Sequence, residues 1–307
     1  MHVVIAGGRG FLGTPLSRAL ADDGHAVVVL TRRDASPSPP AAPGRITSAR
    51  WQPDGPIDAL AAVLDGVDVV VNLAGESIAG RRWSAAQKAR IRDSRVPVTR
   101  SLAAAVRTAV SRPTVLINAS AVGYYGWHGG EILDETAEAG ADFLATVCRE
   151  WEQAAMAAAD VARVALIRTG IVLARNGGAL AEMVRPFRLC VGGPLGSGRQ
   201  YMSWIHQTDW VDLVRWTIGT QTAAGPINAT APNPVTNAQF SRELAHALRR
   251  PSWLPAPAFA LRLALGEMAD ALLLSGQRVV PARAMALGFR FTYADLGPAL
   301  TALFEPR

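Results

Sequence analysis

The chain has 307 residues, of which 50% are apolar and 18% are charged. This length and composition exclude an intrinsically disordered protein and allow a large core that needs no disulfide or metal to hold it. The net charge is +6, but the 31 basic residues are all arginines except Lys88 and are spread along the chain. This spread disfavours a nucleic-acid partner and favours a basic cleft for an anionic small molecule. Two distant cysteines exclude a disulfide framework.

Residues 1 to about 175 alternate strand-like and helix-like segments. We predict strands at 3–6, 26–30, 67–73, 115–119 and 163–167, and helices at 15–22, 57–64, 84–110 and 141–159, with Pro97 interrupting the third helix. The strand segments are continuous runs of Val, Ile and Leu, which is typical of parallel strands covered on both faces. The predicted fold class is therefore α/β, a doubly wound parallel sheet of the Rossmann-like kind.

Beyond residue 175 glycine, proline and tryptophan become frequent. Helices are predicted at 237–249 and 256–274, with a short last helix within 281–307. We predict a dinucleotide-binding domain at 1–175 with parts of 200–235 interleaved, and a smaller C-terminal substrate lobe at 176–307 that includes a helical extension from about residue 250. Glycines between 192 and 198, followed by Arg199, predict a loop that closes over a ligand.

The sequence also carries an expectation about location. No signal peptide precedes the first predicted strand, and the longest apolar region, 254–274, contains Arg262, Glu267 and Asp270. Such a region is too polar for a membrane span. We therefore expect a cytoplasmic protein with no membrane partner.

A glycine-rich segment directly follows the first predicted strand and opens the first predicted helix. It fits two registers of the dinucleotide-binding pattern, Gly7-Gly10-Gly13 and Gly8-Gly10-Gly13, with Phe11 and Leu12 inside the loop. In either register glycine permits the tight turn and brings backbone N–H groups close to a pyrophosphate at the helix N-terminus. The segment predicts a dinucleotide site; the alternative is a turn that only packs the strand against the helix.

Two arginines follow the second predicted strand, in the order Thr31, Arg32, Arg33, Asp34. An acidic residue at this place binds the ribose 2′-hydroxyl of NAD, whereas an arginine accommodates the 2′-phosphate of NADP. Because the arginines come first, we predict NADP as the cofactor. Asp34 keeps NAD as the less favoured alternative.

Short patterns recur at the ends of the later strands. They are Asn72-Leu73-Ala74-Gly75-Glu76, the segment 120–126 and the segment 204–209, in addition to the glycine loop. Together they resemble the extended and atypical branch of the short-chain dehydrogenase/reductase superfamily, the NAD-dependent epimerase/dehydratase group. Arg82-Trp83, Ser94-Arg95, Trp151-Glu152, Arg168-Thr169-Gly170 and Gly288-Phe289 resemble more narrowly the "epimerase family proteins" with a C-terminal extension of unknown function.

The resemblance implies both a cofactor site and an assembly. The implied cofactor-binding residues are Gly7, Gly10, Phe11, Leu12, Gly13, Thr31, Arg32, Arg33, Leu73, Ala74, Gly75, Glu76, Ser120 and Thr169. Extended members of this superfamily often pair through two helices beside the sheet, so the resemblance also implies a homodimer.

The usual catalytic pair of this superfamily is missing. Its members use Tyr-x-x-x-Lys with a Ser or Thr, where the lysine holds the ribose and the tyrosine transfers a proton. Four residues beyond the four tyrosines stand His128, Gly129, Ile205 and Gly297, so no such pair exists. When the chain is aligned on Glu152, Leu144 and Cys148 occupy the tyrosine and lysine positions.

Other side chains near the predicted edge of the sheet are candidates for the proton transfer. We predict Ser120, Tyr124 and Tyr125 as catalytic residues, with packing, substrate stacking or a strand-end cap as the alternatives. Glu76 is a candidate base or helix cap, and Cys148 is expected to be a buried structural thiol. His128 and His206 are weaker candidates, and the scattered histidines and cysteines predict no metal site.

These patterns predict an NADP-dependent oxidoreductase that acts on a small carbonyl or alcohol. Lys88, Arg92 and Arg95 share one helix face, which is either a solvated face or a contact for an anionic substrate or cofactor phosphate. One alternative is a sugar-nucleotide epimerase or dehydratase, which the missing pair disfavours. The other is a non-catalytic dinucleotide-binding regulator, which the missing pair favours.

Overall fold

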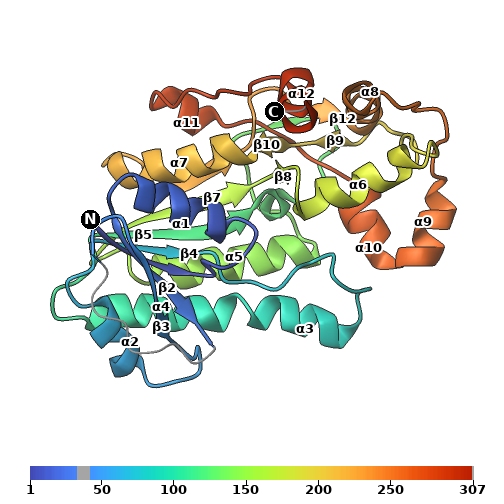
Figure 1. Ribbon diagram of the computed structural model, residues 1–307. Helices are drawn as coiled ribbons and strands as arrows, with labels where there is room; N and C mark the ends of the chain where they lie inside the picture. The colour runs from blue at the N-terminus through green and yellow to red at the C-terminus, as the bar shows by residue number, and fades with distance from the viewer. Residues whose placement is uncertain (33–41, 306–307) are drawn as a thin grey trace.

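The computed structural model describes residues 1–32 and 42–305 and is built around a seven-stranded parallel sheet (Figure 1). In space the strands follow the order β11-β7-β5-β4-β1-β2-β3, which confirms the predicted doubly wound α/β fold. In chain order they are β1 His2–Ala6, β2 Ala26–Thr31, β3 Ile46–Arg50, β4 Val69–Asn72, β5 Val115–Ala121, β7 Arg163–Thr169 and β11 Gly225–Ala229.

Helices cover both faces of the sheet because each central strand is apolar on both sides. In β1, Val3 and Ile5 pack into one core and Val4 and Ala6 into the other. The first core is covered by α1 Gly13–Asp22 and α7 Gln207–Gly219, and the second by α2 Ile57–Leu64, α4 Val96–Thr108 and α5 Phe143–Met156 (Figure 1).

The strand order reverses at β1, which pairs with β2 on one side and β4 on the other. The carboxyl ends of β1, β4 and β5 therefore meet at one edge of the sheet, next to the start of α1. In doubly wound sheets ligands bind in the crevice at this reversal.

Two predicted helices are divided. The segment 84–110 forms α3 Ala85–Asp93 and α4, and the break lies at Ser94 and Arg95 rather than at Pro97. Pro97 is in the first turn of α4, where an N–H group has no acceptor within the helix. The segment 256–274 breaks at Gly266, which has φ +63°.

The strand β3 was not predicted, because Ile46–Arg50 has no apolar run. It is the edge strand and none of its residues is buried. With small side chains at Ser48 and Ala49, this segment has no run of large apolar residues of the kind that predicts a buried strand.

The C-terminal part of the chain adds a third core, formed by α6 Gly178–Arg188, α8 Asn237–Leu248 and α12 Leu296–Phe304. The short elements are η1 Val122–Tyr125, β6 Ile132–Leu133, β8 Ile171–Leu173, β9 Tyr201–Met202, β10 Trp204–His206, β12 Val235–Thr236, α9 Ala258–Leu265, α10 Glu267–Ala269, η2 Asp270–Leu274, β13 Arg278–Val279 and α11 Ala282–Ala286. By contrast, α7 and β11 return to the main sheet. The division at residue 175 stays a prediction.

Within residues 1–32 and 42–305, every helix falls short of the length and apolar character that crossing a bilayer demands.

Candidate functional site

The glycine loop between β1 and α1 has no room for side chains at its corners. Gly7 has φ +77°. Its carbonyl oxygen accepts a hydrogen bond from the N–H of Gly10 at 2.9 Å, which closes the turn. A Cβ on Gly13 would lie 2.2 Å from the same carbonyl oxygen. In the first turn of α1, Thr14 donates its N–H to the carbonyl of Gly10 at 3.0 Å and Pro15 has no N–H. An anion at this helix start is therefore expected to meet the backbone of the loop and of Gly13.

A cavity of about 370 Å³ lies in front of this loop. It is lined by Arg9, Gly10, Phe11, Thr14, Pro15, Arg18, Asn176 and Gln207. Arg9 also donates to the hydroxyl of Ser48 on β3 at 3.0 Å, so its guanidinium reaches from the glycine loop toward the β2–β3 side of the sheet. The loop and its arginines thus form a cationic, glycine-lined cradle that fits a pyrophosphate.

The end of β2 lies beside the end of β3. Thr31 is buried and pairs in register with Arg50, while Arg32 is exposed. A second cavity, of about 210 Å³, adjoins Arg50 and Trp51. Arg33 and Asp34 lie outside the described residues, so their predicted roles stay predictions.

The segment after β4 is tied to the glycine loop and to β5. A Cβ on Gly7 would lie 2.6 Å from the carbonyl oxygen of Leu73, so the two segments are in close contact. The Asn72 side chain donates to Thr99 and to Asn118, both at 2.7 Å, and accepts from the N–H of Ala74 at 3.1 Å. These buried bonds hold the ends of β4 and β5 in register beside the loop.

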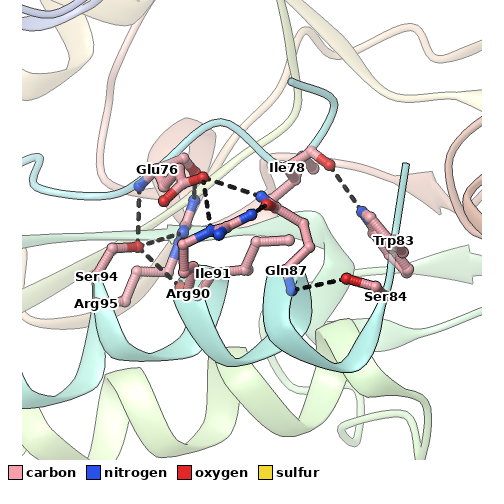
Figure 2. A network of polar contacts seen from close by, with 9 residues as sticks. All are labelled: Glu76, Ile78, Trp83, Ser84, Gln87, Arg90, Ile91, Ser94 and Arg95. Carbon is pink, nitrogen blue, oxygen red and sulfur yellow. Dashed lines mark hydrogen bonds and ion pairs between the residues drawn. The ribbon is translucent and has the colours of Figure 1, made fainter. Parts of the chain in front are cut away.

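Glu76, after the end of β4, makes polar contacts with α3 and with the break that follows α3 (Figure 2). Its carboxylate accepts from Gln87 at 3.0 Å and pairs with Arg90 at 3.7 Å. Its backbone N–H donates to Ser94 at 2.9 Å, and its carbonyl accepts from Arg95 at 2.8 Å. The N-terminus of α3 is capped by the side chain of Ser84 instead. Glu76 is therefore a structural tether between the β4 end and α3.

Two of the three predicted catalytic hydroxyls belong to a buried polar network. Ser120 donates to Glu152 at 2.6 Å, and both oxygens of that carboxylate accept from Arg168 at 2.9 Å. Arg168 also donates to the hydroxyl of Tyr125 at 3.0 Å, which donates to Asn228 at 2.7 Å. This chain of bonds joins β5, α5, β7 and β11.

The pKa values of this network follow from its burial. Burial raises the pKa of Tyr125 to about 12, against the opposing effect of Arg168. Burial alone would lower the pKa of Arg168, but its bonds to Glu152 raise it above the ordinary value. Tyr125 is fully buried, so its hydroxyl is a weak acid that solvent does not reach.

Tyr124 differs from its neighbour. Its ring lies under the guanidinium of Arg168, 3.4 Å from the guanidinium carbon, and its side chain is only half-buried. Tyr124 is therefore the predicted catalytic residue whose side chain remains partly open to a ligand.

The positions of the missing tyrosine and lysine are occupied by side chains that carry no charge. Leu144 on α5 packs against Gly123, and Cys148 is buried, which raises its pKa to about 12. Thr169 accepts from the indole of Trp210 at 3.1 Å and donates to the carbonyl of Ile167.

The two candidate histidines are also placed. His128 pairs with Glu131 in an exposed loop at 3.4 Å. His206 is buried and accepts from the N–H of Thr208 at the start of α7, and burial lowers its pKa to about 4. Neither lies in a described cluster of potential metal ligands.

Sequence reasoning missed several residues that the fold brings to the cavity, among them Arg9, Arg18, Asn176 and Gln207. Arg9 stands inside the glycine pattern and was open to prediction. Gln207 lies in the recognised segment 204–209 but was assigned no role, and Asn176 comes from a distant segment that carries no local signal.

The chain matches family models over most of its length. Residues 3–229 match the NAD dependent epimerase/dehydratase family, and residues 256–303 match a domain of unknown function, DUF1731.

Full-length relatives agree with these matches. The chain is 43% identical to the chloroplastic SDR39U1 homolog of Arabidopsis thaliana, over 99% of this chain and 87% of that protein. It is 38% identical to the epimerase family protein YfhF of Bacillus subtilis, over 100% and 99%. The crystal structure of human epimerase family protein SDR39U1 with NADPH has 34% identity and a TM-score of 0.88, and the match covers 99% of each chain. The chain therefore belongs to the NAD dependent epimerase/dehydratase family.

Proposed function

We propose that this protein is an NADP-dependent oxidoreductase that acts on a small carbonyl or alcohol. The observation that carries the proposal is the cradle at the start of α1, where Gly7 and Gly13 leave no room for a Cβ in the loop. The cavity beside this loop is lined by Gly10, Arg9 and Arg18. A dinucleotide carries its negative charge at such a place. The NADPH present in the human relative supports the same cofactor here.

The choice of NADP over NAD rests on cations at the adenosine end. Arg9 reaches toward β3 through Ser48, and Arg32 follows β2 in an exposed position. Guanidinium groups bind phosphate through paired, charge-assisted hydrogen bonds. Both side chains are thus suited to the 2′-phosphate that distinguishes the two cofactors.

When bound, the nicotinamide supplies a hydride. The chain's own residues hold the pyrophosphate at the glycine loop, order the ends of β4 and β5 through Asn72, and move the proton. We assign the proton transfer to Tyr124, because the hydroxyls of Ser120 and Tyr125 donate to Glu152 and Asn228. The substrate is proposed to be a small molecule. The α3 cations Lys88 and Arg92 pair with Glu267 and Glu150, so they give no preference for an anionic substrate.

The second candidate is a dinucleotide-binding regulator without turnover. Leu144 and Cys148 favour it, because neither transfers a proton at neutral pH when buried in this way. A sugar-nucleotide epimerase is less favoured, since proton abstraction is indispensable to that chemistry.

Titration of the purified protein with NADPH and NADH, followed by nicotinamide fluorescence, tests the proposal. We expect NADPH to bind at least about tenfold more tightly, as one charge-assisted contact to phosphate provides. Arg9→Gln combined with Arg32→Gln should remove most of this preference. Arg112→Gln should retain it, because Arg112 is exposed in the loop before β5, at the amino-terminal ends of the strands and away from the glycine loop.

Lack of binding by either cofactor would exclude both the oxidoreductase and the regulator. Binding without oxidation of NADPH across a panel of aldehydes, ketones and oxo acids would favour the regulator. The homodimer and the cytoplasmic location remain predictions, the first of which light scattering measures directly.

A further inference from the structure

Arg95 occupies the break between α3 and α4, and its side chain turns back over the end of β4. Its guanidinium donates to the carbonyl oxygens of Glu76 and Ile91 at 2.8 and 2.9 Å and to the hydroxyl of Ser94 at 3.2 Å (Figure 2). Three bonds of this kind fix the position of the cation, so its placement is a property of the fold rather than of a mobile surface chain.

The guanidinium lies directly against Gly75. A Cβ on Gly75 would be 3.0 Å from the guanidinium carbon and 3.3 Å from Nε of Arg95. Gly75 itself is exposed, at the edge of the sheet where the ends of β1, β4 and β5 meet. The guanidinium is therefore covered on this side by Gly75, which has no side chain. Gly75 lies two residues after Leu73, which is in close contact with Gly7 of the glycine loop.

On its other side Arg95 meets α5. The guanidinium carbon lies 5.3 Å from the ring of Trp151, which shares a helix face with Cys148 and Leu144 at spacings of three and seven residues. Cys148 faces Ser120 and Ala121 at the end of β5, and the positive charge of Arg95 opposes the effect of burial on the pKa of this thiol. Arg95 thus brings a charge to the helix face where the chain has no lysine.

Arg95 also has hydrogen-bonding capacity to spare. A guanidinium has five N–H donors, and three of them have acceptors among the residues that the structure describes. Nε–H and one Nη2–H are left. Burial lowers the pKa of Arg95, but an arginine keeps its proton under all ordinary conditions.

We propose that Arg95 binds the ribose on the nicotinamide side of the dinucleotide, and so supplies from the α3–α4 junction the cation that the chain lacks on α5. The inference rests on the proposed dinucleotide function. It assigns the two remaining N–H donors to ribose hydroxyls and explains why the residue above the guanidinium is a glycine. Because arginine does not titrate in the ordinary pH range, the contact would hold the ribose with undiminished affinity at high pH.

The test compares two ligands that share the adenosine half. NADPH carries the second ribose, whereas 2′,5′-ADP lacks it. In Arg95→Met, which keeps the bulk and removes the charge, we expect the affinity for NADPH to fall about tenfold or more and the affinity for 2′,5′-ADP to stay within twofold. Arg100→Met, on the exposed side of α4, should change neither affinity.

Equal losses for both ligands, or unchanged affinity for NADPH, would overturn the assignment, since a purely structural tether affects both ligands alike. The failure of the proposed function is a different result: the unmodified protein would bind neither ligand.

A second variant moves the charge to α5. Cys148→Lys in the Arg95→Met background should restore at least a part of the lost affinity for NADPH, because it returns a cation to the same helix face. Absence of rescue in a double variant that still binds 2′,5′-ADP normally would show that the lost affinity did not depend on a cation at this helix face, and would overturn the proposal. Should the double variant not fold, the single-variant comparison decides alone.

Discussion

At the scale of single residues, adjacent tyrosines have opposite roles. The hydroxyl of Tyr125 is buried between Arg168 and Asn228, whereas Tyr124 offers its ring to the same guanidinium and keeps a partly open side chain. A sequence of two tyrosines gives no means of telling them apart. Their difference arises from the short η1 turn, which points one side chain inward and the other along the edge of the sheet.

Phenylalanine at each of these positions separates the roles. Tyr125→Phe leaves the amide oxygen of Asn228 and one N–H of Arg168 without partners in the core, so we expect unfolding to become easier by about 1–3 kcal/mol. NADPH binding should persist. Tyr124→Phe should change stability by less than about 0.5 kcal/mol and abolish turnover. Thermal melts and NADPH titrations of both variants check this, and equal melting temperatures would contradict it.

A second residue-scale prediction concerns acid. The folded state holds His206 neutral, with a pKa of about 4, while in the unfolded chain it takes up a proton below about 6.5. The unfolded state therefore binds more protons between these values, and stability falls as pH falls. We expect His206 to account for about 2 kcal/mol of lost stability between pH 7.5 and pH 5.

His206→Asn is the matched variant for this effect, because asparagine also caps a helix N-terminus. Denaturant unfolding at both pH values should show a smaller loss in the variant than in the unmodified protein. The same loss in both would mean that other groups carry the acid sensitivity.

At the scale of elements, breaks within helices position the site. Gly266 has φ +63°, and its backbone packs against the guanidinium of Arg82. A Cβ on Gly266 would lie 3.0 Å from Nε of Arg82. The break allows Glu267 to reach Lys88 on α3 at 2.6 Å and so joins the C-terminal extension to the first lobe. An exposed ion pair of this kind adds little stability, so the glycine is the more important part of the junction.

Gly266→Ala should strain this junction by about 1–2 kcal/mol, since a left-handed conformation is costly for alanine. We expect faster hydrogen exchange confined to 256–274. Gly219→Ala is the control, because nothing lies within 4 Å of its Cβ position and its φ is not positive. Exchange that is unchanged in the Gly266 variant would show that the break is not needed.

Local patterns predicted most of the elements, and contacts between distant segments explain what was missed. The glycine loop and the end of β4 were predicted from their own residues, because backbone chemistry dictates them. The interruption of 84–110 was assigned to Pro97, although the structure breaks at Ser94 and Arg95. The tether from Glu76 to Ser94 and Arg95 spans eighteen or more residues and has no local signature.

At the scale of the whole molecule, the two lobes share one sheet. The helix α7 buries Trp210, Leu213 and Val214 against the same core as α1, and β11 supplies the outer edge beside β7. The chain thus leaves the first lobe after β7 and comes back to complete it. Both elements lie within 200–235, the range predicted to interleave with residues 1–175, and a cut at residue 175 would remove them from the core that they share with α1.

A fragment that ends at residue 175 should therefore fail to fold cooperatively. It loses α7 and exposes the apolar face that this helix covers, which predicts strong binding of a hydrophobic dye and a broad thermal transition. The full chain should give a single sharp transition. A fragment with its own sharp melt would show that residues 1–175 are an independent domain.

The late return of β11 has a consequence for the chain as it is made. Strand β7 is complete at Thr169, but its partner spans Gly225–Ala229, so the ribosome must add tens of residues before that edge is paired. At ordinary rates of translation the nascent chain presents an open parallel strand for a time on the order of seconds. Unpaired edges of this kind recruit other strands, so we expect aggregation of this protein to begin on crowded polysomes rather than with the finished chain.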